Sequence, residues 1–223
     1  LKMHGGVPRD ELERENVAAL EKGLENLGRH IRNTGQYGVP LLVAINHFSS
    51  DSEAELQAIA DYTAQRGVQS HVCRHWAEGG AGTEQLARAL AALTADGGAQ
   101  FRTLYEDDLS LWEKTRTIAR SVYGADDIAA DQKIRNRFRQ YEAEGYRHFP
   151  ICMAKTQYSF STDPQLRGAP SDHMVVVRDL ALAAGAEFLV AICGDIMRMP
   201  GLPRKPAANS IFVNQQGHIE GLF

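Results

Sequence analysis

The sequence predicts an α/β protein with a doubly wound, mainly parallel sheet and a more irregular α+β part toward the C-terminus. Short continuous apolar runs such as PLLVAI are typical of strands that are covered on both faces. Amphipathic helical stretches alternate with these runs along the chain, which is the pattern of a parallel sheet with crossover helices. Ligands of such sheets bind at the carboxyl ends of the strands. Candidate site residues are therefore those that follow strands.

A long amphipathic helix is predicted over residues 9–33. Its apolar residues recur at steps of three and four and so form one stripe: Val17, Leu20, Leu24, Leu27 and Ile31. Gly35 and Gly38 follow, and glycine commonly ends a helix.

The run PLLVAI at residues 40–45 is the first predicted strand. Ser50 and Glu53 have the spacing of a capping box, so a second helix is expected from there to about Gln65. SHVCRHW at residues 70–76 is the next strand, and a glycine-rich turn leads to a helix over TEQLARALAAL. FRTLY at residues 101–105 and SLWEKTRTIARSV at residues 110–122 repeat the strand–helix alternation.

The last predicted helix is basic and covers residues 131–145. Three further strands are expected at FPICMAK, HMVVVRDL and EFLVAIC, joined by irregular, proline-rich connections. A soft boundary near residue 100 divides the chain into an α/β part, residues 1–100, and a C-terminal α/β part, residues 101–223.

Composition narrows the classes of function. The chain has 223 residues and a net charge of −4, so it is long enough for a sizeable core and has no broad basic field for nucleic acid or a lipid surface. Cys73, Cys152 and Cys193 are scattered and mostly within apolar runs, which predicts free, buried thiols in a reducing, cytoplasmic compartment. No apolar run approaches the roughly 20 residues of a membrane span. A small-molecule substrate is the best expectation.

Two aromatic residues follow successive strands. Phe48 comes after LLVAI and Trp76 after SHVCRH, so a parallel pairing of these strands places both at one sheet edge. Two rings in that position could hold a planar ligand between them. The alternative is that either aromatic caps the core, which is the commoner role of such residues.

Three weaker signals indicate anion binding. Gly79, Gly80 and Gly82 precede a helix, where free N–H groups can hold a phosphate, although a tight turn explains the glycines equally well. Lys155 and the threonine after it resemble the end of a phosphate-binding loop, but G-x-x-x-x-G-K-[ST] does not occur in the 223 residues. Asp195 ends a strand and suits either a ligand or a turn.

A metal site is not predicted. His71, Cys73 and His75 alternate, so on one strand they would share a face and could ligate a metal. Such sites usually draw ligands from more than one element, and no fourth ligand is indicated.

Several long blocks occur in a characteristic order: LKMHGG, VPLLVAINHFSSDSEAEL, AKTQYSFSTDP, GDIMRMPGLPRKPAA and the terminal GLF. Together they resemble the C-terminal two fifths of formate tetrahydrofolate ligase, also called formyltetrahydrofolate synthetase. The resemblance implies a homotetramer with a fold of P-loop NTPase type. It also implies ATP, with magnesium, formate and tetrahydrofolate as substrates: ATP phosphorylates formate to formyl phosphate, which the folate amine attacks. By the same resemblance Phe48 and Trp76 would stack on the pterin and Val72 would line the pocket.

The chain departs from the family at several positions. His47 stands where a lysine or arginine is usual, Ser49 replaces a proline and Arg198 replaces a threonine. The family's phosphate-binding loop and catalytic residues are expected upstream of Leu1, in an N-terminal half that this chain lacks. The expected function is therefore the folate-binding part of the ligase, inactive by itself. The alternatives are a noncatalytic folate-binding or interaction module and an inactive truncated fragment.

Overall fold

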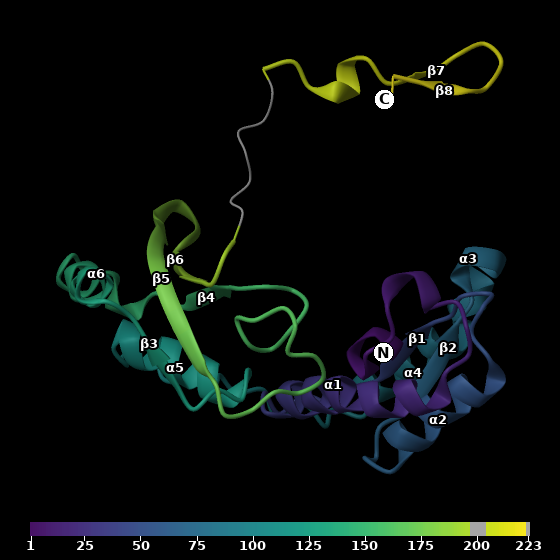
Figure 1. Cartoon of the computed structure of the whole chain (residues 1–223), viewed down its shortest axis with the longest axis horizontal. Helices are drawn as coiled ribbons and strands as arrows, with labels where there is room; N and C mark the ends of the chain where they lie inside the picture. Colours follow the sequence, from purple (N-terminus) through teal and green to yellow (C-terminus); the bar gives the residue numbers. More distant parts are fainter. Residues whose placement is uncertain (197–203, 222–223) are drawn as a thin grey trace.

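The computed structural model describes residues 1–196 and 204–221. Within them the protein is α/β, as the sequence predicts (Figure 1). The strands of these residues do not form one doubly wound sheet. They lie in a parallel pair, β1–β2, a four-stranded sheet in the order β3-β5-β6-β4, and a small hairpin, β7–β8. The P-loop type of fold and the boundary near residue 100 stay predictions.

Helix α1, Val17–Gly35, begins at the first residue of the apolar stripe and not at residue 9, as predicted. Asn16 caps it by accepting a 2.9 Å hydrogen bond from the Ala19 N–H, and Arg9–Glu11 form a separate 3₁₀ turn, η2. A preceding 3₁₀ turn, η1, covers Lys2–Gly5. The predicted C-terminal end of α1 is confirmed. Gly38 has φ +67°, the left-handed conformation that glycine adopts without strain.

Strands β1, Val43–Asn46, and β2, Ser70–Cys73, pair in parallel with Asn46 opposite Cys73. The connecting helix α2, Glu53–Ala64, packs on α1 through one apolar core. The members of this core lie on both helices and on β1: Leu20, Leu24, Ile45, Leu56 and Ile59. This arrangement brings the loops after β1 and β2 to the same sheet edge.

The predicted capping box is wrong by two residues. Ser52, and not Ser50, caps α2: its hydroxyl accepts from the Glu55 N–H at 3.2 Å, and the Glu55 carboxylate accepts from the Ser52 N–H. Both serines precede a glutamate by three residues, so spacing alone does not distinguish them.

Ser52→Ala is expected to lower the free energy of unfolding by about 1 kcal/mol, because the first turn of α2 loses its capping acceptor. Urea unfolding measures this loss. The matched control is Ser50→Ala, an exposed position two residues away, which should change stability by less than about 0.5 kcal/mol. Equal losses in the two variants would show that the cap is misassigned.

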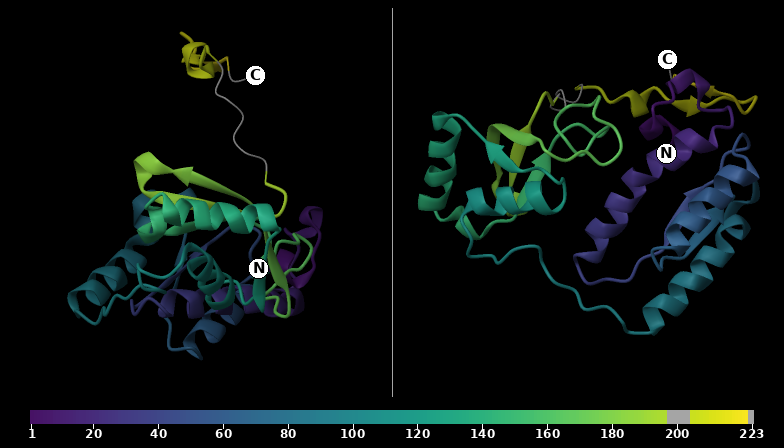
Figure 2. Two further views of the ribbon diagram at one scale, coloured as in Figure 1. Left: turned by 90° about the vertical axis from the view of Figure 1, so that its left-hand side faces the viewer. Right: turned by 60° about the horizontal axis from the view of Figure 1, so that its bottom comes forward.

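After β2 come a short helix α3, His75–Glu78, a 3₁₀ turn η3, Gly79–Thr83, and helix α4, Glu84–Ala95. The strand predicted at residues 101–105 is wrong, since this segment is irregular. Its backbone is tied to the end of the first helix by Gln100 N–H to Gly38 O and Arg102 N–H to Tyr37 O. Figure 2 shows the connection from α4 to α5 crossing from the part that contains β1 and β2 to the part that contains the four-stranded sheet.

The four-stranded sheet contains β3, Asp127–Ala129, β4, Ile151–Ala154, β5, Met174–Ala183, and β6, Phe188–Cys193. The last three confirm the predicted strands, whereas β3 was missed. β3–β5 and β4–β6 are parallel, but β5–β6 are antiparallel. The predicted helices at this end are confirmed as α5, Leu111–Ser121, and α6, Gln132–Ala143.

Helices α5 and α6 cover the sheet face that carries the buried side chains of Val175 and Val177. The opposite face is open at Met174 and Val176. Cys152, on the edge strand β4, is also exposed, so the prediction that all three thiols are buried is wrong for this one. Cys73 and Cys193 are buried as predicted, and all three cysteines are free.

Helix α1 links the part that contains β1 and β2 to the part that contains the four-stranded sheet. Its Arg29, Arg32 and Asn33 side chains donate to backbone carbonyls of residues 121–123, at the end of α5. The hairpin at the other end of the chain consists of β7, Phe212–Val213, and β8, Ile219–Glu220. In the part of the chain that the structure describes, no helix has the length and apolar character of a membrane span. Arg198 lies outside the described residues.

Candidate functional site: an aromatic cavity beyond two parallel strands

Phe48 and Trp76 line one cavity at the carboxyl ends of β1 and β2. The cavity has a volume of about 460 Å³, within the range of small-molecule sites, and His47, Ser49, Arg74 and Ala77 complete its lining. Phe48 is 55% exposed and Trp76 79% exposed, although both are large apolar side chains. Neither aromatic is a core residue, which removes the alternative that they simply cap the core.

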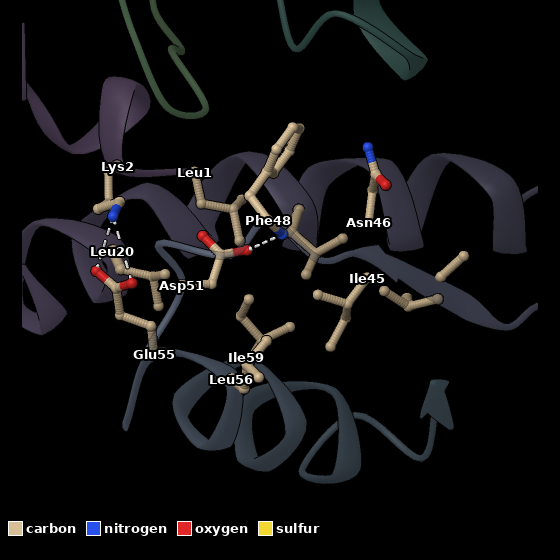
Figure 3. Close-up of a pocket in the computed structure, with 13 residues that line it drawn as sticks. Leu1, Lys2, Leu20, Ile45, Asn46, Phe48, Asp51, Glu55, Leu56 and Ile59 are labelled. Atoms are coloured by element: carbon tan, nitrogen blue, oxygen red, sulfur yellow. Dashed lines mark hydrogen bonds and ion pairs between the residues drawn. The ribbon is translucent and has the colours of Figure 1, made fainter. Parts of the chain in front are cut away.

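The turn after β1 holds Phe48 in this position. The Phe48 N–H donates to the Asp51 carboxylate at 2.8 Å, and the Asp51 N–H donates back to the Phe48 carbonyl at 3.0 Å. The side chain of Phe48 points away from Leu56 and Ile59, the core residues of α2 (Figure 3). The two hydrogen bonds between Asp51 and the Phe48 backbone thus fix the turn that carries the exposed Phe48 ring.

Trp76 is positioned by the glycine-rich turn that follows it. The Arg74 N–H donates to the Gly82 carbonyl at 3.0 Å, and a Cβ on Gly82 would lie 2.5 Å from the carbonyl carbon of Arg74. Gly79 has φ +59°. Both glycines are therefore required by the backbone of the turn that follows Trp76, whereas nothing crowds Gly80. No contact described for these glycines requires an anion.

Val72 does not line the aromatic cavity within the described part of the chain. It packs against the core between α1 and α2 and lines a neighbouring polar cavity with His71, Arg74 and Gly82. Phe48 also borders a second, largely apolar cavity of about 310 Å³ beneath β1, together with Ile45 and Leu56 (Figure 3).

Lys155 and Asp195 lie elsewhere. Lys155 follows β4 and lines a small cavity against α1, and burial lowers the pKa of its ammonium to about 8. Asp195 is exposed and pairs with Arg178 on β5. Neither residue lines the aromatic cavity in residues 1–196 and 204–221, so the structure does not join them to Phe48 and Trp76.

The H-x-C-x-H stretch does not lie on one strand face, contrary to expectation. β2 ends at Cys73, and His75 opens α3. Among the described residues, no group of three or more His, Cys, Asp or Glu side chains could hold a metal ion. Nε2 of His71 is buried and has no hydrogen-bond partner in that same part of the chain.

Arg74 and Ala77 are the lining residues that sequence reasoning missed, and Arg74 is the charged one. It lies between β2 and Trp76, and the same argument that placed Trp76 at the sheet edge applied to it. Its guanidinium is 4.0 Å from the Glu53 carboxylate, and its side chain is 41% exposed. The cavity therefore combines two aromatic faces with a cation, which suits a planar, anionic ligand.

Comparison with known proteins supplies a family. A model of the family described as formate–tetrahydrofolate ligase matches residues 1–223. Among curated relatives, the formate–tetrahydrofolate ligases of Ruegeria pomeroyi and Sinorhizobium fredii are each 56% identical over 223 residues. That of Granulibacter bethesdensis is also 56% identical over the same length.

The match covers all of this chain but only part of each relative. It includes 100% of the chain and 40% of the Ruegeria and Sinorhizobium proteins. For the Granulibacter protein the share is 39%. The chain thus spans about two fifths of the length of these relatives.

Proposed function

The chain belongs to the formate–tetrahydrofolate ligase family, and from that premise we propose that it is the tetrahydrofolate-binding part of the ligase. The pterin lies between Phe48 and Trp76 in the aromatic cavity. The observation that carries this proposal is the exposure of both aromatics on one cavity at the carboxyl ends of two parallel strands. Exposed apolar area of this kind typically marks a binding site.

The other lining groups fit the same ligand. Two aromatic faces can stack on a flat ring from both sides. Arg74 adds a positive charge for the carboxylates of the folate tail. His47 and Ser49, where this chain departs from the family, line the same cavity and would tune the contact with the ring. Val72 lies outside this lining, on β2, so the expected contact of Val72 with the pterin is not part of the proposal.

The proposed reaction of the complete ligase joins formate to tetrahydrofolate at the expense of ATP, through formyl phosphate. Phosphoryl transfer depends on cations and donors positioned around the phosphates. ATP and its magnesium are assigned no residue here, because the 223 residues contain no G-x-x-x-x-G-K-[ST] and the described residues no metal-binding cluster. We propose that the complete ligase is a cytoplasmic homotetramer in which this chain holds the folate and another segment activates formate. Within this chain, we propose a boundary between two parts near residue 100.

Equilibrium dialysis of tetrahydrofolate against the purified chain tests the proposal. Phe48→Ala should weaken binding by about 1–3 kcal/mol, because one stacking face is lost. Phe101→Ala is the matched control: Phe101 is 69% exposed but does not line the cavity, so binding should be unchanged. The same chain should give no formyltetrahydrofolate with ATP and formate. Equal affinities of the Phe48→Ala and unsubstituted chains would refute the assigned site.

A further inference from the structure

The small cavity that Lys155 lines against α1 lies where three distant segments meet, away from the aromatic site. His4 of η1, His30 of α1 and Lys155 after β4 line it, with Tyr123 and Ser159. Its volume is about 160 Å³, well below the roughly 300 Å³ at which sites for organic ligands begin. A water molecule takes about 30 Å³ of liquid volume. The cavity thus has room for a small ion and not for a folate or a whole nucleotide.

Lys155 brings a positive charge to this cavity and has no ion-pair partner among the described residues. Its ammonium donates to the carbonyls of Thr156, at 3.1 Å, and Ser159. It also lies 4.7 Å from the centre of the Tyr123 ring. An ammonium has three N–H donors, so one remains after these two bonds.

The described residues that surround the Lys155 ammonium do not neutralise its charge. Within residues 1–196 and 204–221, no residue that lines the cavity carries a carboxylate. Burial raises the pKa of the nearby Cys193 thiol to about 12, so this thiol is uncharged at neutral pH. Burial lowers the pKa of Lys155 to about 8, which still leaves most of the ammonium charged at pH 7. A partly buried cation without a counter-ion is costly, and an anion would offset that cost.

The two histidines add donors. His4 Nδ1 accepts a 3.2 Å hydrogen bond from the Gly168 N–H, which leaves Nε2 as the protonated nitrogen of the neutral ring. Burial lowers the pKa of His4, and the charges of the N-terminus, Arg167 and His30 lower it further. Burial and then the charge of Lys155 lower the pKa of His30. The N-terminus, Arg167 and Lys155 thus place positive charge around the two rings, which again favours an anion.

We propose that this cavity is a binding site for a small oxyanion, an inorganic phosphate or the terminal phosphoryl group of a nucleotide, held by Lys155, His4 and His30. Lys155 supplies the charge, and the imidazole N–H groups supply neutral donors. Asn26 and Thr156 also line the cavity and can complete the shell. The site is separate from the aromatic cavity and goes beyond the proposed folate binding.

Calorimetric titration of the full chain with inorganic phosphate at pH 7 tests this inference. Lys155→Met should weaken phosphate binding by about ten- to a hundredfold, the loss expected for one charged hydrogen bond. Lys133→Met is the matched control, because Lys133 is exposed on α6, and it should bind phosphate unchanged. His30→Gln provides a second variant in case Lys155→Met does not fold. It should weaken phosphate binding less than Lys155→Met does, because it removes a neutral donor and not a charge.

A histidine-detected NMR titration supplies an independent readout. Phosphate should raise the pKa of both His4 and His30, because the bound anion counters the positive field on the rings.

Titration with ADP distinguishes the two sources of the oxyanion. Binding of phosphate but not ADP would assign the site to the free ion, and tighter binding of ADP would assign it to the phosphoryl end of a nucleotide. Undetectable binding at millimolar phosphate, equal binding of acetate, or unchanged affinity in Lys155→Met would overturn the proposal. Tetrahydrofolate binding should be the same in all variants, so the two sites fail separately.

Discussion

Replacing Glu55 with alanine is expected to lower the free energy of unfolding by about 3–5 kcal/mol. Its side chain is only 2% exposed and forms an ion pair with Lys2, with 3.1 Å between Nζ and Oε1. It also accepts the Asn16 N–H at 2.8 Å and the Ser52 N–H at 3.4 Å. Truncation would leave a buried ammonium and two donors without their acceptor. The carboxylate thus joins the segment before α1 to the start of α2.

Urea unfolding of three variants separates this effect from a general cost of substitution. Glu55→Gln keeps one acceptor and should lose less than Glu55→Ala. Glu53→Ala is the matched control two residues away: this side chain is 91% exposed and should change stability by less than about 0.5 kcal/mol. A loss below about 1 kcal/mol in Glu55→Ala would contradict the buried network.

The same carboxylate makes stability depend on pH. Burial alone would raise the pKa of Glu55, but the hydrogen bonds from Asn16, Lys2 and Ser52 outweigh it, so the folded-state pKa lies below the ordinary value of 4.5. A depressed acid pKa means that the unfolded chain binds more protons as pH falls. The contribution of Glu55 is therefore complete above pH 4.5 and is lost as pH falls through the folded-state pKa. In the Glu55→Gln variant, the free energy of unfolding should therefore fall less steeply as the pH is lowered.

Trp76→Ala, in a complete ligase that contains this chain, is expected to weaken tetrahydrofolate binding by about 1–3 kcal/mol, because it removes one stacking face. Trp76→Phe should keep most of the affinity, since a planar face remains. The affinities of the ligase for ATP and formate should change much less. The melting temperature should not fall, because the Trp76 side chain is 79% exposed and leaves no cavity behind.

Trp112→Ala gives the contrasting result. Trp112 packs edge-on against Phe138 at 5.4 Å between ring centroids and lies under the Arg135 guanidinium. Its truncation should lower the melting temperature and affect all substrates together. If Trp76→Ala behaves like Trp112→Ala, the exposed aromatic is a structural residue and the folate assignment is wrong.

The position of the aromatic cavity followed from the sequence because it depends on local order. A strand, a turn with an aromatic, a helix and a parallel strand place Phe48 and Trp76 at one edge whatever the rest of the chain does. Helix α5 was predictable for the same reason, since Ser110 caps it and its apolar stripe is regular.

Features set by tertiary contacts were not predictable. Which serine caps α2 is decided by Glu55, and Glu55 is held by Lys2 and Asn16 from 53 and 39 residues away in sequence. Strand β3 has only three residues, so it carries no periodicity, and it is defined by pairing with β5. The separation into distinct sheets also depends on pairing, because FRTLY bonds to the end of α1 and does not extend either sheet. The Lys155 cavity is formed by η1, α1 and the segment after β4, which are far apart in the sequence, so no local pattern predicts it.

The emission of Trp76 during a tetrahydrofolate titration tests the central claim most directly. The chain has two tryptophans, so Trp112→Phe leaves Trp76 as the sole emitter. A free tryptophan amide in the same titration corrects for absorption by the folate. Stacking of the pterin on Trp76 predicts a saturable quench at the affinity found by dialysis, and Phe48→Ala should shift it to higher folate concentrations. Unchanged Trp76 emission while dialysis shows bound folate would place the ligand elsewhere and contradict the account.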